Sequence, residues 1–331
     1  MALRVAPLFA STIGWGLSAS PNRILLRSVG IVAAIGLALI LNGTVESLSG
    51  NQATGFACLA LLVFGLPHGS LDIALLRNQS KLNGWQVLAA VLAYLGCAAL
   101  VYVVWHEAPV LALAAFLGIA WIHFAEDWAA AQPPFFALAT ASAILTLPAL
   151  LHQKMMGEIF VRLTGDATAS VLADLAKMAA PVALVAAIVG LVLAWRDRRK
   201  TEAIETATIL LGMIFLPPII GFAAFFCLSH SPRHFAAAKS SFRGDGRHLN
   251  FEALTLTVAG LGIAALIYAS ARPGLPDDKM IVASFITLSI LTVPHILVPR
   301  LFARQRLRSI EGDMTSARPL YQTAVSSRGK I

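Results

Sequence analysis

Five of the eight histidines lie inside long apolar stretches of the sequence, and these five are the residues best suited to chemistry. They are His68, His123, His230, His234 and His295. A polar side chain at membrane depth costs free energy and is a functional candidate by default. Any one of them could be a core histidine that is hydrogen-bonded across helices. Five together favour a shared metal site.

The spacing of His230 and His234 supports this reading, because residues four apart lie on one face of a helix. The H-x-x-x-H pattern alone is common by chance. The metalloprotease form needs a glutamate after the first histidine, whereas Ser231 follows here. Pro232 lies between the pair and predicts a kink that releases the Leu228 carbonyl from the helix.

The same interval of four joins His68 to Asp72 and His123 to Asp127. A metal-bound imidazole usually donates its other N–H to a carboxylate or a carbonyl. Each aspartate could therefore orient an imidazole, or pair with the intramembrane charge of Arg233. The alternatives are that the aspartates lie near the lipid head groups and that Arg233 extends toward them.

An all-histidine site suits iron, zinc, copper or nickel, and it can leave a coordination position open for dioxygen. Aromatic residues flank the histidines and predict an apolar pocket for a lipid substrate, although such residues also face lipid or fill cores. The candidates for the pocket are Trp121, Phe124, Trp128 and Phe226.

The amino-acid composition indicates the environment in which these residues lie. Hydrophobic residues make up 58% of the chain and charged residues only 13%, against roughly a quarter charged in soluble domains. The chain is therefore expected to lie in a lipid bilayer. The net charge of +8 comes from short clusters between apolar runs, which indicates membrane topology rather than a nucleic-acid partner. Three cysteines without C-x-x-C spacing imply neither a disulfide framework nor a zinc knuckle.

The expected fold is an all-α polytopic membrane bundle of eight to ten transmembrane helices, with ten preferred. A span needs about 20 apolar residues. The stretch 203–239 is too long for one span and is divided by Pro217 and Pro218 into two, of which 203–217 is short. The other predicted helices are 24–41, 54–76, 85–105, 108–131, 134–151, 178–195, 254–271 and 280–298.

Basic residues then predict the orientation, because cytoplasmic loops are rich in Lys and Arg. Both termini and the loops near residues 77–81, 196–200, 239–247 and 300–308 are expected on the cytoplasmic side of the cell membrane. Segment 151–177 is assigned to the outer side. The helices that bear the histidines all run inward, and each histidine lies ~13 Å from the cytoplasmic end, in one layer. We divide the chain into a cytoplasmic segment 1–22, a transmembrane catalytic domain 23–302 and a disordered polar tail 303–331.

Four motifs in this order resemble those of the Brp/Blh family of membrane β-carotene dioxygenases. They are GLPHGSLD around His68, His123-Phe124 followed by Asp127, HSPRH from His230 to His234, and Pro294-His295. The family patterns are P-H-G-x-x-D, H-F-G-x-x-D, H-S-x-R-H and a late P-H. Among the positions that depart from the family, Ile73 replaces a frequent histidine and Ala125 replaces the glycine of the second motif.

The resemblance implies an Fe(2+) enzyme that splits β-carotene at its central double bond with O2 and yields two molecules of retinal. His68, His123, His230 and His234 match the positions that hold iron. His295 matches a further ligand or a pocket residue. A functional link to a retinal-binding rhodopsin is also implied.

Three other classes remain open from the residues alone. A di-iron desaturase or hydroxylase acting on a lipid needs more histidine pairs than the one present here. A metal or proton transporter predicts polar residues at several depths. A haem protein needs only two facing histidines.

Overall fold

The computed structural model describes residues 21–44, 51–80, 83–129, 132–242, 246–271 and 276–298, and this part of the chain is helical without any strand. The all-α prediction is confirmed. The helices are α1 Pro21–Thr44, α2 Asn51–Gly69, α3 Asp72–Ser80, α4 Gly84–Glu107, α5 Pro109–Ala125, α6 Pro134–Thr146, α7 Pro148–Thr164, α8 Val171–Arg196, α9 Lys200–Phe215, α10 Pro218–Phe225, α11 Ser231–Ser241, α12 Gly246–Ser270 and a last helix Pro276–Val298. A 3₁₀ turn, η2 (Ala167–Ser170), precedes α8, and a π-helical turn, η3 (Phe226–His230), joins α10 to α11.

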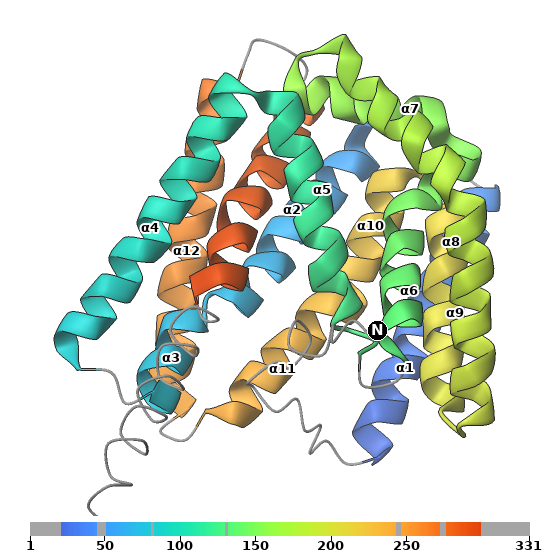
Figure 1. Ribbon diagram of the computed structural model, residues 1–331, viewed down its shortest axis with the longest axis horizontal. Helices are drawn as coiled ribbons and strands as arrows, with labels where there is room; N and C mark the ends of the chain where they lie inside the picture. Colours follow the sequence, from blue (N-terminus) through green and yellow to red (C-terminus); the bar gives the residue numbers. More distant parts are fainter. Residues whose placement is uncertain are drawn as a thin grey trace, which may run out of the picture.

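Each of the ten predicted segments overlaps one or more helices, and α9 and α10 separate at Pro217 and Pro218 as expected. Three expectations need correction. Segment 134–151 is not one helix, because α6 ends at Thr146 and α7 begins at Pro148. Segment 54–76 is not one continuous helix, because α2 ends at Gly69 and α3 begins at Asp72. Most of segment 151–177 is not a loop but belongs to α7, which is bent by 50° from α6 and lies across one end of the bundle (Figure 1). The mixed polar and apolar residues of α7 gave no membrane-span signal.

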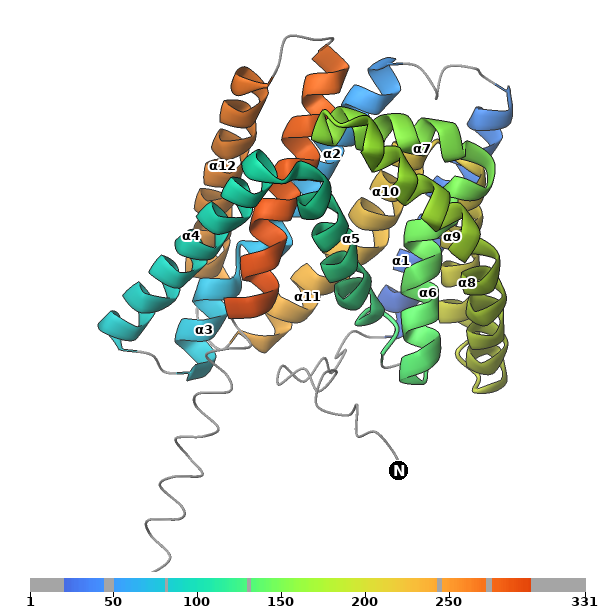
Figure 2. The same ribbon diagram turned by 45° about the horizontal axis from the view of Figure 1, so that its top comes forward.

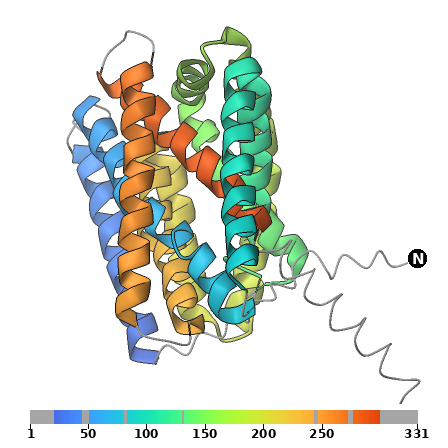
Figure 3. The ribbon, with the colours of Figure 1, turned by 90° about the vertical axis from the view of Figure 1, so that its left-hand side faces the viewer.

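Five of the described helices are long and apolar enough to cross a membrane, and six if α6 and α7 form one bent span. The shorter apolar helices include α5 and the 28–41 part of α1. The ten-span count therefore exceeds what length and composition support. The spans that contain α2 and the last helix are more than half buried, whereas α4 is almost wholly at the periphery. Figure 3 shows the last helix (red) crossing the upright outer helices obliquely.

Basic residues gather at one end of the bundle. The carboxyl ends of α3, α8 and α11 and the amino ends of α4, α9 and α12 lie at the bottom of Figures 1 and 2. Arg77, Arg196, Lys200 and Lys239 belong to these helix ends. The predicted alternation of the helices agrees with this arrangement, and the assignment of this end to the cytoplasm stays a prediction.

Labelling from the two sides of the membrane checks that assignment. Arg198→Cys, at the basic end, should react with an impermeant maleimide only after the membrane is opened. Asp277→Cys, at the start of the last helix, should react in intact cells. Cys97→Ala and Cys227→Ala remove background labelling, and Cys58 is buried. Labelling of both positions from the same side contradicts the topology.

Candidate metal centre

Three buried histidines from two parts of the chain converge in the interior. His123 lies in the last turn of α5, His230 ends η3, and His234 lies in the first turn of α11. One nitrogen from each ring lies within 4.8 Å of the others. The side chain of His68 lies outside the described residues, so only its backbone is placed, near the end of α2, which packs against η3 and α11.

The π-helical turn sets the position of His230. Pro232 has no N–H to donate, so a regular helix cannot continue through it without losing a bond. The chain instead widens over Phe226–His230, and the backbone N–H of Ser231 donates to the Phe226 carbonyl five residues earlier. Such π turns are frequent at functional sites. The kink predicted at Pro232 is thus a π-helical turn. The ring centroids of His230 and His234 lie 4.3 Å apart.

Asp127 contacts two histidines at once. Its Oδ2 lies 2.8 Å from His230 Nδ1 and its Oδ1 lies 2.9 Å from His234 Nε2. The Asp127 side chain is only 2% exposed. These contacts leave His230 Nε2 and His234 Nδ1 as the nitrogens that can turn toward a metal.

The sequence suggested that Asp127 contacts His123 within one helix. In the structure Glu126 contacts His123 instead. Helix α5 ends at Ala125, and the next N–H groups bond three residues back, as from Asp127 to Phe124 at 3.1 Å. In such a tight turn residues i and i+3 are eclipsed. Glu126 therefore reaches His123, with Oε2 3.5 Å from Nδ1, and Asp127 turns to the histidines of η3 and α11.

Arg233 has a different carboxylate partner from either predicted aspartate. Its Nη2 bonds to Oε1 of Glu205 on α9, and its Nη1 donates to the main-chain carbonyl of Asp127 at 3.4 Å. Glu205 is 1% exposed and also accepts from Ser28 at 2.7 Å and Ser229 at 3.1 Å. The signal that could have found Glu205 was a lone acidic residue inside a predicted span.

A second imidazole–carboxylate pair adjoins the first. His295, on the last helix, places Nδ1 2.9 and 2.8 Å from the two oxygens of Asp72 at the start of α3. Its ring centroid lies 5.4 Å from that of His123. Asp72 thus contacts a histidine far away in the sequence, and His295 belongs to the same polar interior as the other histidines.

Two of the four predicted pocket aromatics adjoin the histidines. The rings of Phe124 and Phe226 lie 4.9 and 5.0 Å from that of His230. Trp128 instead stacks on Phe225 in the core and donates to Thr206. Trp121 is 39% exposed and donates to the Leu138 carbonyl on α6, at the outer surface.

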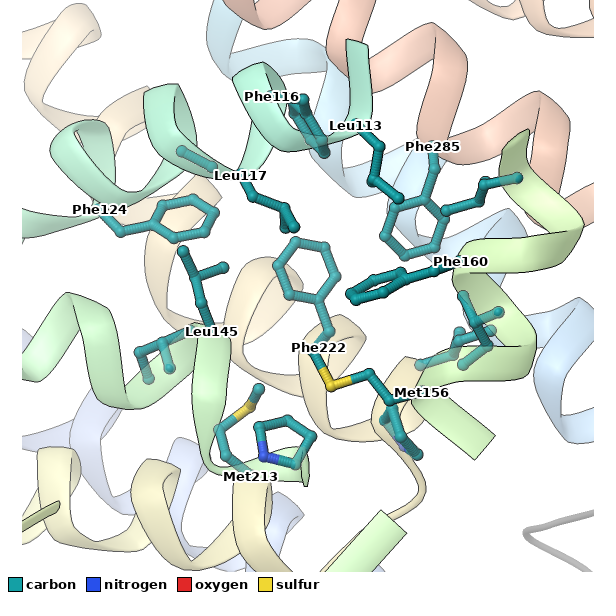
Figure 4. A pocket seen from close by; sticks show the side chains of 17 residues that line it. Leu113, Phe116, Leu117, Phe124, Leu145, Met156, Phe160, Met213, Phe222 and Phe285 are labelled. Carbon is teal, nitrogen blue, oxygen red and sulfur yellow. The ribbon is translucent and has the colours of Figure 1, made fainter. Parts of the chain in front are cut away.

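Apolar cavities lie on both sides of the histidine cluster. One of about 70 Å³ is lined by aromatic and sulfur side chains, among them Phe116, Met156, Phe160, Met213, Phe222 and Phe285 (Figure 4). The other, of about 260 Å³, is bounded by α2, α4, α12 and the last helix, and Asp72 and His295 lie in its wall. A hollow of about 10 Å³ beside His123 and His230 shares residues with both, including Phe124 and Leu288.

The chemistry of the donor set fits a divalent first-row transition metal. Zinc–imidazole bonds are ~2.0–2.1 Å long, so nitrogens that share a tetrahedral ion are ~3.4 Å apart. The three nitrogens lie within 4.8 Å of one another, so rotation of the rings toward a common point would bring them to bonding distance of one ion. Imidazole suits zinc, copper, iron and nickel alike, and three such ligands leave positions open. His123, His230 and His234 could therefore hold a metal ion.

Removing two of these donors should remove the metal. We expect the His230→Ala, His234→Ala double variant to lose the metal that the purified wild-type protein carries, measured by elemental analysis per chain. Asp127→Asn should weaken metal binding by ~10- to 100-fold, because its carboxylate orients two rings. Asp72→Asn should weaken it less, because that carboxylate bonds to the ring of His295. His106→Ala is the control, since that side chain is 78% exposed at the far end of α4. Full metal content in the double variant contradicts the site.

The Glu205–Arg233 pair should be important for stability. Removing one partner of a buried ion pair costs ~3–5 kcal/mol, so Glu205→Gln should clearly lower the unfolding temperature in detergent. Adding Arg233→Met should recover part of the loss, because the uncompensated charge is gone. Glu202→Gln on the same helix is the control, since its pair with Arg199 is 3.6 Å long and exposed and is worth ~1 kcal/mol or less. Equal losses in the two single variants contradict this assignment.

Comparison with known proteins assigns the chain to a family. The family model described as "Beta-carotene 15,15'-dioxygenase" matches residues 58–303, which is more than half of the chain and includes the five predicted histidines. A protein named "Beta-carotene 15,15'-dioxygenase" from uncultured marine bacterium 66A03 is 27% identical over 264 residues, covering 75% of this chain and 94% of that protein. A "Probable beta-carotene 15,15'-dioxygenase Blh" from Halobacterium salinarum is 24% identical over 326 residues, covering 85% and 94%.

No solved structure matches the chain. The family resemblance drawn from four short motifs is thus supported by a match that runs from α2 to the end of the last helix. The chain belongs to the beta-carotene 15,15'-dioxygenase family.

Proposed function

We propose that this protein is an iron(II)-dependent membrane dioxygenase that cleaves β-carotene at its 15,15' double bond with O2 and releases two molecules of all-trans-retinal. The observation that carries the proposal is the position of the histidine cluster between two apolar cavities. An elongated apolar molecule bound across both cavities has its middle beside the histidines. Cleavage at a central bond requires such room on each side.

In this proposal His123, His230 and His234 hold the iron, and His68 is the fourth ligand by its match to the family motif. A ferrous ion supplies the binding and activation of dioxygen, which zinc cannot do because it has no redox chemistry. His295 is a further ligand or a pocket residue, and its contact with Asp72 fixes the orientation of its ring.

The surrounding residues have three tasks. Asp127 fixes which nitrogens of His230 and His234 face inward. Arg233 and Glu205 hold the backbone of the Asp127 turn against α9. Phe124 and Phe226 pack against His230 and exclude water from the reacting double bond.

The electron balance separates this reaction from the desaturase or hydroxylase alternative. Cleavage breaks one carbon–carbon double bond and forms two carbonyl bonds, and the two atoms of O2 become the two aldehyde oxygens. The four electrons that reduce O2 come from the two carbons, so no stoichiometric reductant is consumed. A hydroxylase places one oxygen atom in the product and needs two external electrons to convert the other into water.

A membrane location suits this substrate, because an apolar polyene is concentrated in the hydrocarbon layer. The cell membrane as the site and the cytoplasmic position of both termini are part of the proposal. A retinal-binding rhodopsin as the recipient of the product is likewise a prediction from the family resemblance.

Expression in cells that make β-carotene tests the reaction. The protein should bleach the yellow pigment and produce retinal, identified by chromatography and mass, and both effects should stop without oxygen. The His230→Ala, His234→Ala variant provides the matched negative control. Persistent colour with folded, iron-loaded protein, or hydroxylated carotenoids as the products, contradicts the dioxygenase assignment.

A further inference from the structure

The larger cavity reaches the outer surface of the bundle between α4 and α12. Its inner wall contains the buried residues Leu66 and Leu288. Other residues of the same lining are exposed: Leu95 on α4 is 59% exposed, and Leu256 and Ile263 on α12 are 45% and 36% exposed. Figure 3 faces this side, and the last helix (red) is visible between α12 (orange) and α4 (teal).

The surface around this opening is apolar. Leu92 and Leu100 on α4 and Leu254 and Leu266 on α12 each expose more than half of their area. Both helices are candidate membrane spans with few buried residues. The opening therefore faces the hydrocarbon layer of the bilayer and not water.

The interior of the same cavity ends at the polar groups of the site. Asp72 and His295 lie in its wall, and the His295 ring centroid is 5.4 Å from that of His123. We propose that the opening between α4 and α12 is the entrance through which an elongated apolar polyene passes from the bilayer to the metal centre. This inference rests on the proposed function, which supplies the kind of ligand.

The second cavity has a different lining from the first. All of its lining residues, such as Leu113, Phe160 and Met213, are buried or half-buried. A polyene that enters between α4 and α12 passes the histidines with its leading end and places that end in the second cavity. The flexible thioethers of Met156 and Met213 allow this small cavity to adapt to the leading ring.

A folded enzyme can be blocked at the entrance after purification. Ala259 lines the opening and is exposed, so Ala259→Cys, in a chain that also carries Cys97→Ala and Cys227→Ala, can be modified with pyrenyl maleimide. Val258→Cys is the matched control, because the neighbouring residue is 58% exposed and lies outside that lining. Each variant is also measured before modification, which shows whether its substitutions alone alter the fold.

Modification of Ala259→Cys should lower kcat/KM for β-carotene by about tenfold or more, and modification of Val258→Cys should leave it within about twofold. A second measurement does not depend on cleavage: the amount of β-carotene that the anaerobic protein retains, read from its visible absorbance, should fall only for modified Ala259→Cys. If modification changes kcat/KM and β-carotene retention equally in the two proteins, the proposed entrance is contradicted. If the unmodified enzyme binds β-carotene without cleaving it, the proposed function fails. The retention measurement still tests whether the polyene enters between α4 and α12.

Discussion

The contact of one carboxylate with two imidazoles is the interaction on which the site depends. Asp127 places one oxygen on His230 and the other on His234, in an interior where an unpaired charge is costly. The two rings belong to a helix that Pro232 forces to widen, and the carboxylate belongs to a turn that ends α5. The end of α5 at Ala125 and the π-helical turn are therefore both needed, because neither alone brings Asp127 into contact with both rings.

A second buried charge pair connects this arrangement to the rest of the bundle. Glu205 on α9 contacts Arg233 on α11 and accepts from Ser28 on α1, while Arg233 reaches the backbone of Asp127. Helices α1, α9 and α11 are therefore held in one register around the histidines. The apolar contacts of a bundle in lipid are not directional, so such polar contacts are well suited to fix how the helices face one another.

Much of this fold could be predicted from apolar runs and prolines, including the division at Pro217 and the helices around it. The convergence of His123, His230 and His234 could be predicted as well, since buried imidazoles on helices that run in one direction share a depth. The partners of the charged residues could not. Which carboxylate reaches Arg233 depends on helix rotation, and which acid reaches His123 depends on the tight turn after Ala125, and neither has a signature in residue spacing.

The separation of the two cavities by the histidines also bears on the release of the products of the proposed reaction. In that reaction each cavity holds one of the two identical aldehydes, one beside the opening between α4 and α12 and the other against the phenylalanine and methionine side chains of the second cavity. An aldehyde in the second cavity that leaves by the same opening must pass the metal centre after the first aldehyde has gone. Under this proposal the two products leave in a fixed order, although they are chemically identical.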